Sequence, residues 1–233
     1  MTGVLFDGDS GRLRLSPELF EAFYDWAEGE RGDGEGLRTL SEAGVLADGK
    51  PHPAVAPVVD AMSDPACLLS VHGAAADGSG VHGAGWLGGE SAALLLDAPD
   101  DLVELTGTAP ASMPAAVACV VGLAPRPVPD AAAVPLPTAE VEELFENEPH
   151  DGRPLTGHSV LEAVGASAAD GARWWEVATR WPDAAGTPHT RTLRVLDTAD
   201  GLWAVIRSDS ERTTLEPVSA TAVWRLLLRC FPL

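Results

Sequence analysis

Two histidines have a spacing along the chain that is compatible with a chemical role, such as binding a metal ion. His72 and His82 flank the loop AADGSG on either side, so a hairpin would place them face to face. Two imidazoles can bind a metal ion, but a closed site needs a third and a fourth ligand, and Asp77 alone is a poor supplement. We therefore expect surface histidines and no metal site.

Catalytic motifs are missing from the sequence. The segment Asp7–Gly11 resembles the start of a calcium loop, but the sixth position is Arg12 where glycine is needed, so we expect a hairpin turn. No G-x-S-x-G elbow occurs, and no phosphate-binding glycine loop precedes the single lysine, Lys50. We predict no catalytic residue and no cofactor. A dense acidic run is expected to lie on a solvated helix face: Glu140, Glu142, Glu143, Glu146 and Glu148.

The three cysteines are far apart in the chain. Cys67, Cys119 and Cys230 lie in apolar runs and form neither a C-x-x-C motif nor a zinc-ligand spacing. Because an odd number cannot form a closed disulfide set, we expect reduced cysteines in the core and no disulfide.

Charge narrows the classes of partner. The 35 acidic residues outweigh the 15 basic ones, for a net charge of −20. Such a surface repels nucleic acid and anionic membranes, which are bound chiefly through Lys and Arg. The N-terminus has acids where a signal peptide has a basic region, and residues 115–124, the longest apolar stretch, are too few to span a bilayer. We expect a cytoplasmic protein that binds no nucleic acid and does not insert into membranes.

Helical and alternating patterns follow one another along the chain. Ser16, Pro17 and Glu18 form a helix start, and apolar residues then recur at helical spacing to Glu28. From Cys67 the period changes to two, which predicts an antiparallel meander as far as Leu105. Further helices are expected over residues 37–43, 53–63, 114–123, 138–148 and 159–169, and a second meander and a last helix over residues 175–230.

The order of elements occurs twice. PASMPAAVACVV from Pro110 and PVSATAVWRLLL from Pro217 begin at equivalent points, at an offset of 107 (217 − 110). We therefore predict an α+β fold with a central antiparallel sheet flanked by two helical bundles, built as a quasi-twofold repeat of a helices–meander–helix half. Residues 1–233 are expected to form one domain. Its halves, 1–124 and 138–233, are joined by a proline-rich strap, 125–137, in extended conformation.

The chain contains seven tryptophans but only one tyrosine. Trp174 and Trp175 are consecutive, so in a strand their side chains point to opposite faces. Either the sheet is covered on both sides, or one indole meets solvent or a partner; Trp203 poses the same question. Core packing is the default for each, although exposed aromatic rings are what binding hot spots are made from.

Two segments have a recognisable pattern: LSEAGVLADGKPHPAVAPVVDAMSDP, with Gly44, Pro53 and Pro65 at helix boundaries, and RTLRVLDTADGLWAVIRSDSERTTLEPVSATAVWRLLLRCF. In these features they resemble the EspG family, the cytoplasmic chaperones associated with type VII (ESX) secretion. In the second, Asp197-Thr198 matches the family's turn and Pro217 the start of its last helix. The family fold is a central antiparallel sheet between two helical bundles, which agrees with the predicted duplication.

The resemblance implies a protein-binding role without catalysis. Family members bind the hydrophobic helical tip of a secreted protein through the central sheet, the second helical bundle and the loop between the second and third strands. If Val4–Phe6 is the first strand, that loop is residues 75–80. We therefore expect partner contacts at Asp77, Gly78, Ser79, Gly80, Trp174, Trp175 and Trp203.

Two other functions remain open. An acidic immunity or antitoxin protein would neutralise a basic toxin through its −20 surface. A small hydrolase would need an active site of unrecognised form. A large exposed apolar patch favours the chaperone, a cleft ringed with carboxylates favours the immunity protein, and a pocket of converging polar groups favours the hydrolase. The sequence indicates neither the identity of the partner nor an oligomeric state.

Overall fold

The computed structural model describes residues 3–29, 34–75, 79–146, 159–166, 171–207 and 211–232. Its helices are α1 (Pro17–Ala27), α2 (Gly34–Glu42), α3 (Ala56–Ser63), η1 (Pro110–Ser112, a 3-10 helix), α4 (Met113–Val120), α5 (Thr138–Glu146), α6 (Ser159–Ala163) and α7 (Ala220–Cys230). Its strands are β1 (Val4–Asp7), β2 (Arg12–Leu15), β3 (Leu46–Ala47), β4 (Lys50–Pro51), β5 (Cys67–Ala75), β6 (Gly80–Leu87), β7 (Ala92–Ala98), β8 (Leu102–Thr108), β9 (Val134–Pro137), β10 (Arg173–Pro182), β11 (Pro188–Thr198), β12 (Gly201–Arg207) and β13 (Arg212–Val218).

Eleven of these strands form one sheet in the order β1-β2-β8-β7-β6-β5-β10-β11-β12-β13-β9. Each neighbouring pair is antiparallel. Reading outward from the centre, β5, β6, β7, β8 and β2 of the first half match β10, β11, β12, β13 and β9 of the second. The predicted α+β class, with an antiparallel sheet built from two similar halves, is confirmed.

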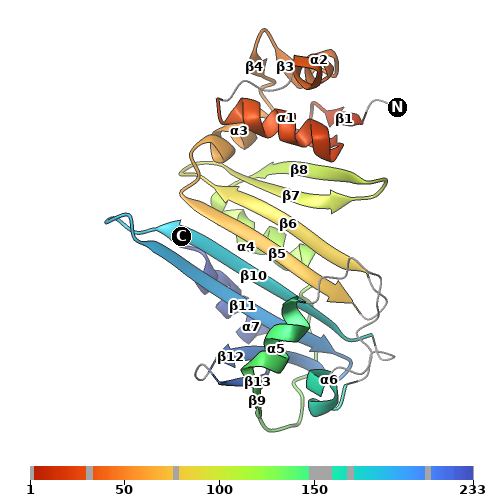
Figure 1. The fold of residues 1–233 in the computed structure, drawn as a ribbon, viewed down its shortest axis with the longest axis vertical. Helices are drawn as coiled ribbons and strands as arrows, with labels where there is room; N and C mark the ends of the chain where they lie inside the picture. Colours follow the sequence, from red (N-terminus) through yellow and green to blue (C-terminus); the bar gives the residue numbers. More distant parts are fainter. Residues whose placement is uncertain are drawn as a thin grey trace.

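Helices cover the two faces of the sheet unequally (Figure 1). On one face α1 and α3 pack near the β7–β8 end, and α5 and α6 pack over the β10–β13 end. On the other face α4 and α7 contact each other and cover the centre. The middle of the first face, where β6, β5, β10 and β11 run side by side, therefore lies between these two groups of helices; among the described helices, α3 reaches it at β6 and α5 reaches it at β10 and β11.

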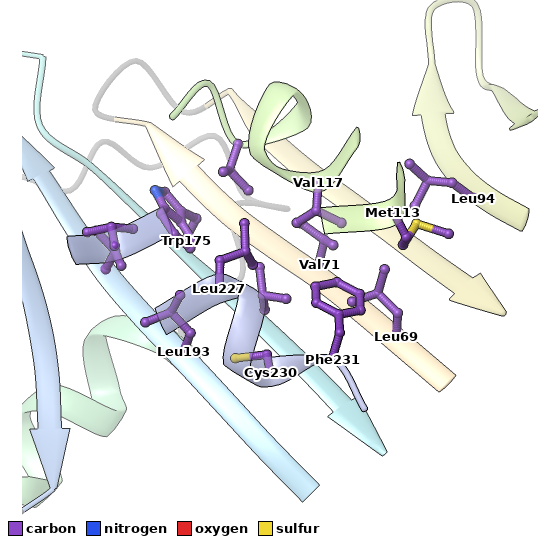
Figure 2. Close-up of a cluster of buried hydrophobic side chains, with 14 of the residues drawn as sticks. Leu69, Val71, Leu94, Met113, Val117, Trp175, Leu193, Leu227, Cys230 and Phe231 are labelled. Carbon is purple, nitrogen blue, oxygen red and sulfur yellow. The ribbon is translucent and has the colours of Figure 1, made fainter. Parts of the chain in front are cut away.

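Figure 2 shows the core beneath α4 and α7. Met113 and Val117 of α4 and Leu227 of α7 point at the sheet, where they meet Val71 of β5 and Trp175 of β10. The side chains of this cluster come from both halves of the chain, because β5 and β10 pair with each other at the centre of the sheet. The two halves thus share the core cluster beneath α4 and α7.

Local signals in the sequence account for several boundaries. The Ser16 hydroxyl accepts a hydrogen bond from the Leu19 N–H and caps α1 (3.4 Å), as predicted. Gly44, with φ of 78°, follows α2 in the left-handed region, which glycine adopts without strain. Asp7 to Arg12 close the β1–β2 hairpin.

Three boundaries differ from the prediction. Residues 12–15 form the strand β2, which was not predicted because an alternation of four residues is too short to indicate a strand. Helix α3 begins at Ala56, not at Pro53, since a turn precedes it. Helix α6 ends at Ala163, and residues 167–169 of its predicted continuation lie outside the described residues.

The proline-rich strap 125–137 has two parts. Residues 125–133 contain neither helix nor strand, and residues 134–137 form β9, an edge strand that pairs with β13. Proline in β9 is compatible with this position because an edge strand leaves half of its backbone groups unpaired. Asp197 of β11 binds Arg126 of the strap and Arg173 of β10, at 3.2 and 2.6 Å. The Arg126–Asp197 ion pair attaches the strap to the sheet.

Candidate functional site

The uncovered middle of the sheet is the candidate site. Along β5 the odd-numbered residues Cys67, Leu69 and Val71 are buried against α4 and α7, whereas the even-numbered residues Leu68 to His72 are half-buried or exposed. The same alternation holds in β10 and the adjoining part of β11. We call these residues the open strip: His82 and Ala84 of β6; Leu68, Ser70 and His72 of β5; Glu176, Ala178 and Arg180 of β10; Thr190, Thr192 and Arg194 of β11.

Small side chains form the middle of the open strip. Ser70 pairs with Ala84 on one side and with Ala178 on the other. Ala178 in turn pairs with Thr192. A row of four small residues therefore crosses four strands, with longer side chains on both sides of it. Because successive strands lie about 4.8 Å apart, this row is about 14 Å long.

One end of the open strip carries a chain of polar contacts. The Nδ1 atoms of His72 and His82 lie 3.4 Å apart, as the predicted hairpin requires. His72 pairs across the strands with Glu176, which accepts a hydrogen bond from Arg194. Arg194 also donates to Glu142 of α5 at 2.6 Å and lies over the Phe145 ring, 5.2 Å from its centre.

The Arg194 site fixes α5 against the sheet. Burial acts to lower the pKa of Arg194, but its hydrogen bonds to Glu142 and Glu176 outweigh burial and raise it. The acidic run on α5 is thus not a uniform solvated face: Glu142 is engaged with the sheet, Glu140 accepts from the Ser159 hydroxyl at 2.6 Å, and Glu143 is exposed.

The opposite end of the open strip is apolar and positively charged. Leu68 is 43% exposed and pairs directly with Arg180, whose side chain is exposed. In the part of the chain that the structure describes, the Arg180 side chain makes no ion pair. Beside them lies a mostly apolar hollow between Pro65 and the far end of the β10–β11 hairpin at Trp181.

All three tryptophans predicted to contact a partner are buried, each 2% exposed. Trp175 lies in the core under α4 and α7, whereas Trp174 and Trp203 lie on the opposite face near α5 and α6. The sheet is therefore covered on both sides at these positions, and none of the three indoles is exposed to solvent. The structure places Trp174 and Trp203 in one row, with Leu196 between them, and their partner-binding role stays a prediction.

The predicted contact loop falls partly outside the described residues, which exclude Asp77 and Gly78. Ser79 and Gly80 are exposed and share one hollow with Trp174 and Trp175. Since β2 was not predicted, the count used to select this loop was wrong. Residues 75–80 join β5 to β6, next to the histidine end of the open strip.

Neither a metal site nor a reactive cysteine pair stands out. Within the described residues, no group of three or more His, Cys, Asp or Glu side chains could bind a metal ion. Cys67 and Cys230 are buried, as predicted, but Cys119 is exposed. The reason is helical geometry, because Val117 and Val121 of the same helical segment turn inward and place Cys119 on its outer side. No described helix is long and apolar enough to cross a membrane.

Comparison with known proteins identifies a family and solved structures with a similar fold. The EspG family model matches residues 6–227 of the chain. The fold is similar to that in the structure of the Mycobacterium tuberculosis type VII secretion system chaperone EspG5 in complex with the PE25–PPE41 dimer. The TM-score is 0.58 and the sequence identity 14%, over 95% of this chain and 97% of that one. No curated protein matches the sequence.

Proposed function

The chain belongs to the EspG family, and from this membership we propose that it is a cytoplasmic chaperone of type VII secretion, which binds a secreted helical protein and catalyses no reaction. The similar fold seen in complex with the PE25–PPE41 dimer supports a PE–PPE dimer as the class of partner.

The open strip is the observation that carries this proposal. A sheet that is covered on one face by α4 and α7 has the middle of its other face bordered by helices on both sides, with α5 reaching Arg194 at one border and the α1–α3 cluster reaching Ala84 at the other. An α-helix rises about 1.5 Å per residue, so a helix that lies along the row of small residues would place about nine of its residues across the four strands. A partner helix would complete the missing layer.

The chemistry of the strip indicates how such a partner is held. Exposed large hydrophobic residues are scattered over the described surface, and of these only Leu68 belongs to the strip. Its remaining residues are small, hydroxylic or charged of both signs, including Glu176 and Arg180. This mixture favours a specific helix surface over a general apolar one. It also disfavours an immunity protein, which would need a continuous acidic cleft.

The residues predicted from the family resemblance take different parts in this proposal. Ser79 and Gly80 are exposed beside the histidine end of the strip, so we propose that the loop containing Asp77 and Gly78 contacts the partner there. Trp174, Trp175 and Trp203 are buried, so we propose that they hold the sheet and α5 in place without touching the partner.

Copurification from the chain's own host tests the function. A tagged chain is expected to copurify with a PE–PPE dimer, and the complex should persist through a series of rising salt concentrations, because burial of a helix surface depends little on screening. Recovery of a basic toxin, released by moderate salt, would contradict the chaperone and favour the acidic immunity protein.

A further inference from the structure

The open strip has an approximate twofold axis through its middle. Ser70 and Ala178 face each other across the β5–β10 pair, and their positions in the chain differ by 108 (178 − 70). Ala84 and Thr192, at the two outer positions of the row of small residues, differ by the same amount (192 − 84). The middle of the strip therefore looks similar from either half of the chain, and it cannot by itself orient a partner helix.

The two ends of the strip break this symmetry. The same shift along the chain relates His72 to Arg180 and Leu68 to Glu176 (180 − 72 and 176 − 68). At one end, Glu176 is paired with Arg194, which also binds Glu142. At the other end, Arg180 makes no side-chain ion pair with any described residue, and Leu68 is exposed beside an apolar hollow. The polar contacts are largely satisfied within the chain at the first end and unsatisfied at the second.

The guanidinium of Arg180 next to the exposed Leu68 is complementary to a carboxylate next to an apolar side chain. In a chain with a net charge of −20, an exposed arginine that makes no ion pair with a described residue is a place that attracts a carboxylate. The β carbons of directly paired residues such as Leu68 and Arg180 lie about 5 Å apart. Residues three or four apart on a helix have β carbons at about the same separation, 5–6 Å. The two spacings match.

We propose that the Leu68–Arg180 end of the open strip is the specificity anchor for the partner, an inference that rests on the proposed chaperone function. This end of the strip binds an apolar side chain and an Asp or Glu side chain that lie one helical turn apart on the partner helix. The apolar side chain packs on Leu68 and enters the hollow beside Pro65, while the carboxylate pairs with Arg180. This end thereby sets the direction in which the partner lies on the symmetric row.

Photo-crosslinking in the chain's own host tests the anchor. A benzophenone amino acid replaces Leu68, His72 or Leu228 in three separate variants; Leu228, 40% exposed on α7, is the control because α7 covers the opposite face. We expect crosslinks from positions 68 and 72, but not from 228, to the same secreted helical protein. Mass spectrometry should place the attachment at position 68 on an apolar residue, with Asp or Glu three or four residues away.

The outcomes separate the anchor from the function. Crosslinks from position 72 without any from 68, or attachment at 68 far from an acid, would overturn the anchor and leave the chaperone intact. Crosslinks from neither position would overturn both.

Charge reversal gives a second test with the purified complex. Arg180→Glu should weaken binding by at least about tenfold, whereas Arg225→Glu, an equal charge change on the exposed side of α7, should stay within about twofold. Equal losses of affinity for the two variants would show that only the net charge of the protein matters, and would overturn the anchor. Circular dichroism of each variant confirms that the fold is retained.

Discussion

Trp203 shows how burial at one residue changes a functional expectation. Its indole is 2% exposed in the cluster that includes Leu144 and Phe145 of α5. The Nε1 atoms of Trp203 and Trp174 are buried and have no hydrogen-bond partner among the described residues. An indole in this position stabilises the fold through its apolar contacts, and its N–H group contributes nothing to offset its lost hydration.

Truncation of Trp203 should therefore reduce stability more than partner affinity. We expect Trp203→Ala to lower the free energy of unfolding by about 3–5 kcal/mol. Trp203→Phe should cost less than half of that, because the ring contacts largely remain and an unpaired donor is removed. Urea denaturation measures both. A Trp203→Ala variant with unchanged stability and weakened partner binding would instead support direct contact.

The cysteines should differ sharply in reactivity. Burial raises the pKa of the Cys67 thiol and raises that of Cys230 to about 11, whereas Cys119 is exposed. Native protein treated with iodoacetamide at about pH 8 should be alkylated at Cys119 alone, since the thiolate is the nucleophile. Cys119→Ser should take up no label until the protein unfolds. Rapid labelling of Cys230 in the native protein would contradict its burial.

The raised pKa of Cys230 also determines the direction in which the stability of the protein changes with pH. The folded protein keeps this proton at a pH where the unfolded chain, with a thiol pKa of about 8.5, has lost it. Stability from this group is thus complete below about pH 8.5 and decreases as the pH rises toward about 11. Between these values wild-type protein should lose more stability than Cys230→Ala in urea titrations; an equal loss would contradict the shift.

Much at the residue scale followed from strand alternation. The period of two that begins at Cys67 predicted a strand with alternating faces, and the structure places Cys67, Leu69 and Val71 on one face and Leu68 and Ser70 on the other. Whether that other face is covered depends on where helices distant in the chain pack, and no local pattern contains this. For the same reason the sequence left open whether Trp174 meets solvent.

At the scale of elements, the strap meets the sheet at a glycine. Gly201 begins β12 with φ of 137°, and a β carbon there would lie 2.3 Å from the Pro127 carbonyl oxygen. Gly186, in the β10–β11 turn, also has positive φ, at 80°, but a β carbon there would meet nothing within 4 Å. Substitutions at these two glycines therefore distinguish the cost of backbone strain from the cost of a clash with the strap.

Gly201→Ala should therefore destabilise the protein more than Gly186→Ala. We expect about 1 kcal/mol for Gly186→Ala, the usual cost of a left-handed alanine, and at least ~2 kcal/mol for Gly201→Ala, because backbone must also move. Thermal unfolding of the two variants provides the comparison. Equal costs would mean that the strap does not pack on β12 as the structure shows.

Elements with several agreeing signals were predicted well. The capped helix α1, the meander β5–β8 and the last helix each combine a boundary residue with a clear period. β2 and β9 were not predicted as strands, since four residues, two of them prolines in β9, form strands only because a neighbouring strand provides the pairing. Their positions at or next to the edges of the sheet come from tertiary structure.

At the scale of the whole molecule, the two halves should unfold together. The core under α4 and α7 contains residues from both halves, and β5 pairs with β10 at the centre of the sheet. We expect one cooperative transition, with coincident urea curves from tryptophan fluorescence and circular dichroism. We also expect that cleavage within residues 125–133 leaves the halves associated. Two separate transitions, or two halves that each fold alone, would contradict a single domain.

The duplication was visible in the sequence, but its consequence for the site was not. An offset between two proline-initiated helices indicated two related halves. The register of β5 against β10, which places the axis between Ser70 and Ala178, is a contact between segments that are distant in the chain. Such a register is set by the assembled core, so the open strip became evident only in the structure.

The open strip is the surface that we propose receives the partner helix. Ala178 lies at the centre of the strip, and Ala115 is exposed on α4, which covers the other face. The decisive measurement is calorimetric titration of the Ala178→Trp and Ala115→Trp variants with the PE–PPE dimer that we propose as the partner. A bulky ring on the row of small residues should lower affinity at least about a hundredfold, while Ala115→Trp should bind within about twofold of wild type. Wild-type affinity for Ala178→Trp, in a variant whose circular dichroism is unchanged, would contradict the claim.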